Sequence, residues 1–209
     1  MSTLNEWLIF EEGTIDKKTC NKVKNHGSNW INSKVAVKEK ISEEERVLGH
    51  ELKYKENKLL RISDISWTTD QWIYDLVWPF MVQANDEAGW RYHIKYAEPS
   101  QITRYCKGGF YNFHKDGNGD HLSAYNYPTN NFLHGHVRKL SMSLILNDDF
   151  DGGAFEFISY SNGNGVITPI EAKAGSIIIF PSSMEHRVAP VTKGTRNSLV
   201  TWFVGPPFV

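Results

Sequence analysis

His114, Asp116 and His186 are the residues of this sequence whose types and spacing offer metal chemistry. His114 and Asp116 form an H-x-D pair in FYNFHKDGNGDH, at residues 110–121, which begins with the alternation of a strand. Because alternate residues of a strand project to the same face, both side chains can reach one ion. His186 follows an apolar run and a turn at 181–183. Two imidazoles and one carboxylate form the facial triad that leaves open positions on iron(II).

The same segment also begins like a calcium-binding loop. Asp116, Asn118 and Asp120 fit the first three ligand positions of an EF-hand. The sixth position, which requires Gly, is His121, and the twelfth, which requires Glu, is Tyr127. Since both positions that make the motif specific are wrong, we expect a solvated, turn-rich loop here in place of a calcium site.

Arg196 follows His186 on the next expected strand, with Ser198 on the same face. A guanidinium binds a carboxylate through two hydrogen bonds and keeps its charge, and a neighbouring hydroxyl adds a donor. Val200 and Trp202 continue this face, which favours an enclosed position over a surface charge. The strand is therefore predicted to carry a site for a carboxylate.

Length and charge narrow the classes of protein. The 209 residues suit a single domain over 1–209, with 1–90 as a supporting helical region and 91–209 as the core. The 23 Lys and Arg residues nearly balance the 24 Asp and Glu residues, so no basic field points to a nucleic-acid partner.

The expected compartment is reducing and cytoplasmic. Cys20 and Cys106 lie far apart, and the first residues lack the basic and apolar segments of a signal peptide. No stretch approaches the roughly 20 apolar residues of a membrane span, so we expect a soluble protein without a membrane partner.

Helical signals dominate the first ninety residues. A short amphipathic pattern lies between Asp16 and Gly27, a marginal candidate lies over 42–49, and the clearest helix lies within 68–89, with Thr69 or Asp70 as its cap. Pro79 lies inside this last pattern, so we expect a kink or a split there. The face of this helix that we expect to be buried consists of Trp72, Leu76, Phe80 and Gln83.

From Trp90 onward, short alternating runs separated by Gly, Asn, Asp and Pro predict an antiparallel sandwich or barrel. In KLSMSLIL, over 139–146, the even-numbered residues form an apolar face expected to pack on helices, while Ser141, Ser143 and Ile145 face a ligand cavity. The expected strands are 90–97, 101–106, 109–114, 139–147, 154–158, 166–171, 176–180, 186–190 and 196–204.

Several motifs occur in an order that resembles the 2-oxoglutarate and iron(II)-dependent dioxygenases, most of all their prolyl 4-hydroxylase-like branch. They are Tyr105 with GGFYNFHKD, KLSMSLILNDDFDGGAFEF, GSIIIFPSSMEHRVAPVTKGTR and RNSLVTWFVGP. The similarity runs from about Gln101 to Pro206. It implies a mainly β fold with a double-stranded β-helix core of the jelly-roll or cupin-like type, buttressed by the N-terminal helices.

The resemblance also implies roles for individual residues. His114, Asp116 and His186 match the iron ligands of the family. Arg196 matches the partner of the distal carboxylate of 2-oxoglutarate, Tyr105 and Ser198 match hydroxyls that assist there, and Trp202 matches an aromatic wall near the metal. Some relatives place a tyrosine where this chain has Ile145, so the distal carboxylate has fewer hydroxyl partners here.

The activity implied is hydroxylation of an unactivated C–H bond with release of succinate and CO2. Iron(II), 2-oxoglutarate and O2 are the implied cofactor and cosubstrates, and ascorbate is expected as an accessory. The leading substrate is a prolyl residue of a peptide or protein, while free proline, lysyl side chains and small metabolites stay open. The alternatives are a zinc hydrolase with the same ligands, which has no use for Arg196, and a non-catalytic jelly-roll binding module.

The loop over 117–136 follows the strand with the H-x-D pair and has little periodicity. We expect it to be a lid that is mobile without substrate; a tolerated insertion is the alternative. Its apolar residues available to a peptide are Tyr125, Tyr127 and Phe132, and its histidines, expected to be solvated and not a second metal site, are His121, His134 and His136.

Overall fold

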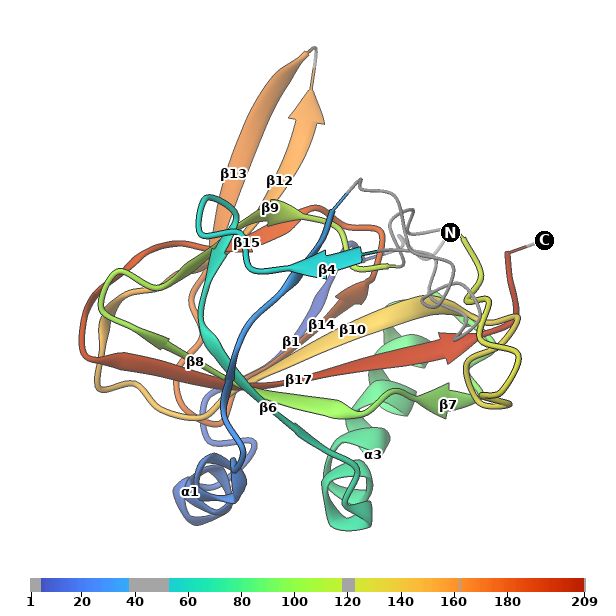
Figure 1. The fold of residues 1–209 in the computed structure, drawn as a ribbon, viewed down its shortest axis with the longest axis horizontal. Helices are drawn as coiled ribbons and strands as arrows, with labels where there is room; N and C mark the ends of the chain where they lie inside the picture. The colour runs from blue at the N-terminus through green and yellow to red at the C-terminus, as the bar shows by residue number, and fades with distance from the viewer. Residues whose placement is uncertain (1–4, 38–52, 118–122, 162, 209) are drawn as a thin grey trace.

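The computed structural model describes residues 5–37, 53–117, 123–161 and 163–208. Its strands form two large antiparallel sheets (Figure 1). The larger sheet has the order β1 (Leu8–Phe10), β14 (Ile177–Pro181), β10 (Val137–Ile145), β17 (Thr195–Gly205), β8 (Ser100–Cys106), β6 (Asp64–Thr68) and β2 (Ile31–Asn32), with β7 (Tyr96–Ala97) beside β17.

The smaller sheet faces the larger one and supplies the other wall of the molecule. A core cluster between them joins Phe155 and Phe157 of the smaller sheet to Ile145, Ile178 and Phe180 of the larger one. The order of the smaller sheet is β13 (Asn164–Ile170), β12 (Phe155–Ser161), β15 (His186–Val188), β9 (Phe110–His114) and β5 (Arg61–Ile62). Two short ribbons pair β11 (Asp151–Gly152) with β16 (Val191–Lys193) and β3 (Val35–Val37) with β4 (Lys53–Lys55).

Two helices cover the outer face of the larger sheet (Figure 1). Helix α1 (Lys17–His26) begins after Asp16, whose side chain accepts a hydrogen bond from the Thr19 backbone N–H at 3.0 Å. Helix α3 (Gln71–Glu87) packs beside it. The even-numbered apolar residues of β10, Leu140, Met142 and Leu144, lie in the same cluster as the buried helix residues, which confirms the expected face.

The expected buried face of α3 is wrong by one position. Its buried residues are Ile73, Val77, Met81 and Ala84, whereas Trp72, Leu76 and Phe80 are partly buried at the flanks and Gln83 is exposed. We attribute the shift to packing, because slim aliphatic side chains let the helix axis approach the sheet while rings fill the gaps beside it.

Pro79 does not split α3. The helix continues from Gln71 to Glu87 with Pro79 inside it. Both Pro79 and Asp75 lie on the exposed face, so the Asp75 carbonyl that lacks an intrahelical donor can bond to water. The marginal helix candidate over 42–49 lies outside the described residues. Among those that are described, no helix is long and apolar enough to cross a membrane.

Residues 1–90 contribute strands as well as helices, which the sequence pattern did not indicate. β1, β2 and β6 extend the larger sheet and β5 extends the smaller one. Since these strands have only two to five residues, they show too little alternation to be recognised. The strand expected over 90–97 is likewise reduced to Tyr96–Ala97, and the short strands β11 and β16 went unnoticed.

Most strands expected after residue 100 are confirmed with small shifts of their ends. The hairpin of β12 and β13 is longer than expected and projects from the body of the molecule (Figure 1). The strands that matter for the site, β8, β9, β10, β15 and β17, all lie within the region where alternation is clear.

Candidate active site

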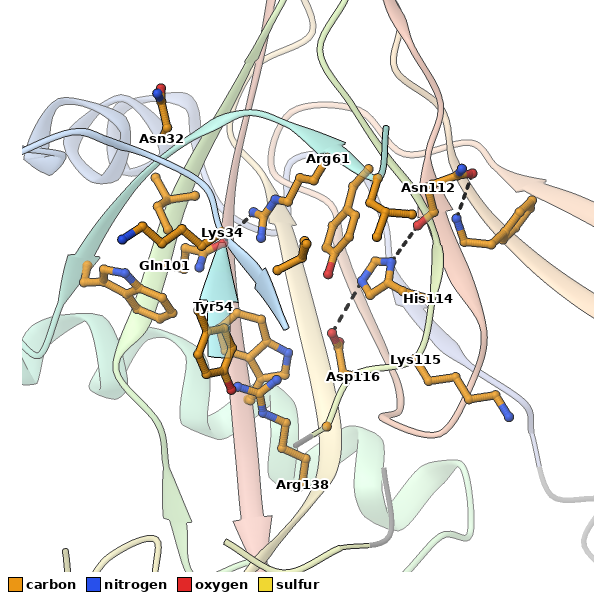
Figure 2. Close-up of a pocket in the computed structure, with 18 of the residues that line it drawn as sticks. Asn32, Lys34, Tyr54, Arg61, Gln101, Asn112, His114, Lys115, Asp116 and Arg138 are labelled. Carbon is orange, nitrogen blue, oxygen red and sulfur yellow. Dashed lines mark hydrogen bonds and ion pairs between the residues drawn. The ribbon is translucent and has the colours of Figure 1, made fainter. Parts of the chain in front are cut away.

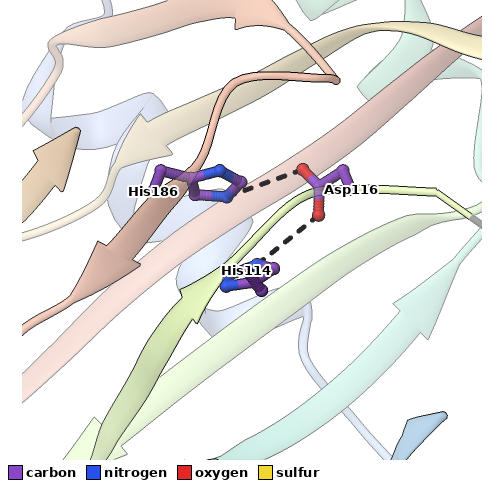
Figure 3. Close-up of side chains that lie close together, drawn as sticks. All are labelled: His114, Asp116 and His186. Atoms are coloured by element: carbon purple, nitrogen blue, oxygen red, sulfur yellow. Dashed lines mark ion pairs between the residues drawn. The ribbon is translucent and has the colours of Figure 1, made fainter. Parts of the chain in front are cut away.

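The pairing of β9 with β15 brings the three candidate metal ligands together. His114 ends β9, His186 begins β15, and the two are direct partners in the antiparallel register. The Asp116 carboxylate lies between them, with Oδ1 3.6 Å from His114 Nε2 and Oδ2 3.6 Å from His186 Nε2 (Figure 3). One ligand atom from each residue falls within 4.8 Å of the others.

Backbone carbonyls fix the orientation of both imidazoles. His114 Nδ1 lies 2.8 Å from the Asn112 carbonyl oxygen, and His186 Nδ1 lies 3.0 Å from the Met184 carbonyl oxygen. Because a carbonyl can only accept, each Nδ1 carries the proton and each Nε2 presents its lone pair to the centre of the trio. This arrangement is the one that a metal-binding histidine requires.

The protonation states also suit a cation. Burial, and then the neighbouring His114, lowers the pKa of His186 to about 4, so its imidazole is neutral near pH 7. Burial alone raises the pKa of Asp116, but the His186 and His114 imidazoles outweigh it and hold this pKa well below the usual range. His186 therefore offers a neutral nitrogen donor and Asp116 a carboxylate anion.

Hydroxyl groups from the larger sheet hold the Asp116 carboxylate. Ser141 Oγ donates to Asp116 Oδ2 at 2.7 Å and lies 2.9 Å from Ser182 Oγ. The Asp116 backbone N–H donates to the Ser182 carbonyl at 3.0 Å. Ser141 belongs to the face of β10 that was expected to line a cavity, so this part of the alternation is confirmed.

These residues fit a divalent metal ion. Asp116 is buried, and within the described parts of the chain no Lys or Arg makes an ion pair with it. A buried anion without a cation is costly, whereas a metal ion would neutralise it. Two imidazoles and one carboxylate suit iron(II) or zinc. Across the described ranges, this trio is the one such group of His, Cys, Asp and Glu side chains, and His134 and His136 are not part of another.

Arg196 lies deep in a narrow cavity beside the trio. It is 2% exposed, its Nη1 donates to Ser198 Oγ at 3.1 Å, and its guanidinium carbon lies 5.8 Å from the centre of the Tyr105 ring. Arg196 and Tyr105 are register partners on β17 and β8. Burial lowers the pKa of Arg196, but a guanidinium stays charged in proteins. No described carboxylate pairs with it, so the cavity holds an unbalanced positive charge.

Trp202 stands where this inner cavity meets an outer pocket of about 620 Å³. Its indole N–H is buried and has no hydrogen-bond partner among the described residues. The outer pocket also contains His114 and Asp116, which Figure 2 shows together with Arg61 and Arg138. The aromatic residues that line it are Tyr54, Trp67, Tyr111, Phe113, Tyr125 and Trp202.

Sequence reasoning missed several residues of the outer pocket. Arg138 forms two hydrogen bonds with Glu98, at 2.7 and 2.6 Å, and Tyr125 Oη donates to Glu98 at 2.8 Å. Arg138 also lies 4.3 Å from the centre of the Trp202 ring. The strand expected over 139–147 began one residue after Arg138, and no local signal linked Arg138 to Glu98, which lies 40 residues earlier.

The described part of the expected lid is partly ordered by its own backbone. The Tyr125 backbone N–H donates to the His136 carbonyl oxygen at 2.9 Å, and the Gly135 backbone N–H donates to the Tyr125 carbonyl oxygen at 2.8 Å. Tyr125 lines the outer pocket, whereas Phe132 is 64% exposed and packs on Tyr96 away from it. The role of this loop as a lid stays a prediction. Asn118, Asp120 and His121 of the calcium-like pattern lie outside the described residues.

Curated relatives match about half of the chain. A PKHD-type hydroxylase of Stenotrophomonas maltophilia (strain R551-3) is 32% identical over 117 residues, which is 52% of this chain and 44% of that protein. A PKHD-type hydroxylase of Xylella fastidiosa (strain M12) is 35% identical over 106 residues, which is 50% of this chain and 43% of that protein. The matched part thus spans less than half the length of these relatives.

Solved structures share the fold over nearly all of the chain. A viral collagen prolyl hydroxylase from Paramecium Bursaria Chlorella virus-1 has a TM-score of 0.62 at 15% identity, covering 96% of this chain and 97% of that one. A Pseudomonas putida prolyl-4-hydroxylase has a TM-score of 0.60 at 18% identity, covering 95% and 91%. The expected double-stranded β-helix fold, buttressed by N-terminal helices, is confirmed.

The family itself follows from the sequence of the core. Residues 100–204, half of the chain, match the family described as the 2OG-Fe(II) oxygenase superfamily. This span contains the trio, Arg196 and Trp202. The resemblance inferred from the motifs is confirmed at the level of the family. The chain belongs to the 2OG-Fe(II) oxygenase superfamily.

Proposed function

We propose that this chain is an iron(II)- and 2-oxoglutarate-dependent dioxygenase that hydroxylates a prolyl residue of a peptide or protein. The observation that carries the proposal is the presence, in one cavity, of the trio and of a buried guanidinium without a carboxylate partner. The first fits a divalent metal and the second fits one end of a dicarboxylate.

Each residue of the inner cavity has a role in the proposal. His114, Asp116 and His186 hold the iron. When bound, iron(II) supplies the activation of O2 that couples decarboxylation of 2-oxoglutarate to oxidation of a C–H bond, with succinate and CO2 as products. Arg196 binds the distal carboxylate of 2-oxoglutarate. Ser198 and Tyr105 lie beside Arg196, and we assign their hydroxyls as further hydrogen-bond donors to the cosubstrate.

The outer pocket is assigned to the substrate. Its aromatic walls suit the apolar ring of a prolyl residue and exclude water from the reacting carbon. The Trp202 ring forms part of this wall where the outer pocket meets the inner cavity. The structural neighbours named above are prolyl hydroxylases, and a Trichoplax adhaerens prolyl hydroxylase is in complex with a hypoxia inducible factor peptide fragment, which supports a peptide substrate here.

Neither alternative accounts for the whole cavity. A zinc hydrolase would use the trio but has no use for Arg196 and Ser198 at the bottom of the site. A non-catalytic binding module would not need a neutral His186 and an ionised Asp116 aimed at one point. The proposal also includes a reducing, cytoplasmic compartment, which the free thiols of Cys20 and Cys106 support.

Binding of 2-oxoglutarate tests the proposal directly. Anaerobic calorimetry with iron(II) should show 2-oxoglutarate binding that is lost in Asp116→Ala and weakened about 100-fold in Arg196→Gln, because the charge-assisted hydrogen bonds to the carboxylate disappear. Arg196→Lys is the matched control, because it keeps the charge without the bidentate geometry of the guanidinium. Its affinity for 2-oxoglutarate should lie between those of the wild type and Arg196→Gln. Unchanged affinity in Arg196→Gln would remove the assigned role.

Turnover tests the reaction and the substrate. Proline-containing peptides should gain one oxygen by mass spectrometry, with succinate released in step. Ascorbate is assigned as an accessory reductant, and it should extend the number of turnovers. Hydrolysis of a peptide without succinate would contradict the proposal and favour the zinc alternative.

A further inference from the structure

The rim of the site holds a stack of three side chains, and the proposed reaction does not account for the contacts among them. The Tyr111 and His114 rings lie 3.5 Å apart between centroids, with 16° between their planes. The Arg61 guanidinium carbon lies 4.5 Å from the centre of the Tyr111 ring. Tyr111 is therefore held between a cation and a candidate metal ligand.

Strand pairing builds this stack. Arg61 and Tyr111 are register partners on β5 and β9, so their side chains are neighbours across the strands. Arg61 Nε donates to Ser63 Oγ at 2.9 Å and its Nη2 donates to Gln101 Oε1 at 2.8 Å. Arg61 is 9% exposed, and no described carboxylate pairs with it. Its charge is thus directed to the ring, where a cation–π contact is attractive.

His114 needs such support more than His186 does. The His186 ring is enclosed by Phe155, at 5.4 Å, and by Phe180, at 4.7 Å. His114 lies at the rim, and its hydrogen bond to the Asn112 carbonyl fixes one edge of the ring but not its rotation about that bond. Stacking on Tyr111 sets the plane of the imidazole.

We propose that Arg61 and Tyr111 are positioning residues that hold the His114 imidazole in its metal-binding orientation. The inference rests on the proposed metal site and adds that β5, far from the ligand motifs in sequence, contributes to metal affinity. Partners that orient a ligand typically account for about 10- to 100-fold in metal affinity. Because the stack is a contact between ring faces, its geometry, and not the phenol hydroxyl, carries the effect.

Cobalt(II) binding to the full chain, followed by anaerobic calorimetry and by the visible absorption of the bound ion, tests this role. Tyr111→Leu should weaken cobalt binding about 10-fold and change the absorption bands, whereas Tyr111→Phe, which keeps the ring, should stay close to the wild type. Arg61→Met should also weaken binding, and Arg61→Lys, which keeps a cation beside the ring, should retain more affinity than Arg61→Met.

Thermal unfolding of the metal-free variants separates positioning from loss of fold, because a purely structural role would lower the midpoint without changing the cobalt spectrum. Equal affinities and spectra for Tyr111→Leu and Tyr111→Phe would overturn the inference. If Tyr111→Leu does not fold, equal values for Arg61→Met and Arg61→Lys would overturn it in the same way. Failure of the wild type to bind cobalt would instead contradict the proposed function, so the two failures are distinguishable.

Discussion

The two histidines of the site have ring centroids only 4.3 Å apart but lie in different surroundings. The His186 side chain is 6% exposed, inside the aromatic core between the two sheets, whereas the His114 side chain is 17% exposed at the edge of the outer pocket. The deep side of the site is therefore held by the packing that holds the fold. The rim is held by a few specific contacts from elements elsewhere in the sequence.

The largest expected difference between the two sides is in stability. Phe180 is buried and touches His186, so Phe180→Ala should lower the free energy of unfolding by about 3–5 kcal/mol. Trp67 lines the outer pocket and is 47% exposed, so Trp67→Ala should lower it by about 1 kcal/mol or less. Urea denaturation of the metal-free protein measures both, and similar losses would contradict the comparison.

Acid should lower the free energy of unfolding through His186, the histidine on the deep side of the site. Its folded pKa of about 4 lies below its ordinary value of 6.5, so between these values the unfolded chain binds a proton that the folded chain does not. The free energy of unfolding therefore rises with pH across this window and falls on acidification, by about 3 kcal/mol between pH 6.5 and 4.

Urea denaturation of the metal-free protein at several pH values measures this slope. His186→Gln is the matched variant, because its amide does not titrate in this range. Its slope between pH 6.5 and 4 should be clearly shallower. Identical slopes for the two proteins would show that His186 is not responsible.

Substitution of Ser141 tests whether its hydrogen bond to Asp116 contributes to metal affinity. Ser141→Ala removes the hydrogen bond to Asp116 and should weaken cobalt(II) binding about 10-fold or more. Ser143→Ala is the matched control, since Ser143 lies on the same face of β10 but makes no described bond to Asp116. Equal losses in both variants would point to a general effect on the strand.

The smallest expected effect is at the rim. Tyr125→Phe removes one hydrogen bond to Glu98, which should raise the apparent KM for a peptide substrate by about 10-fold or less while leaving 2-oxoglutarate binding unchanged. Burial raises the pKa of Tyr125, so the hydroxyl stays a donor across the usual assay range. A change in 2-oxoglutarate affinity would show that the rim and the deep cavity are not separate.

The deep side and the rim of the site also differ in how far the sequence predicts them. His114 and the pair of Arg196 and Ser198 lie on strands that were expected from the sequence, so their faces follow from alternation. Asp116 lies two residues beyond the end of β9, so strand alternation does not fix its position, and β15 with His186 has only three residues. Arg61 lies on a strand of two residues, which has no recognisable period. Its contact with Tyr111 depends on a pairing between β5 and β9 that no local pattern indicates.

Helix α3 shows the same limit within one element. Its existence followed from the spacing of its apolar residues, but which of two adjacent stripes is buried depended on the sheet against which it packs. Both stripes are apolar, since Trp72, Leu76 and Phe80 compete with Ile73, Val77 and Met81. The packing of the helix against the sheet decides which stripe is buried.

The sequence by itself determined the donor atoms of the site and the faces on which they lie, because residue chemistry and strand alternation are local properties. The tertiary structure decided how those faces meet: the register of β9 with β15, the hydroxyls that hold Asp116, and the stack of Arg61 and Tyr111 on His114. These features depend on pairings between segments distant in sequence, and the energy of such a pairing depends on both partners and on what covers them.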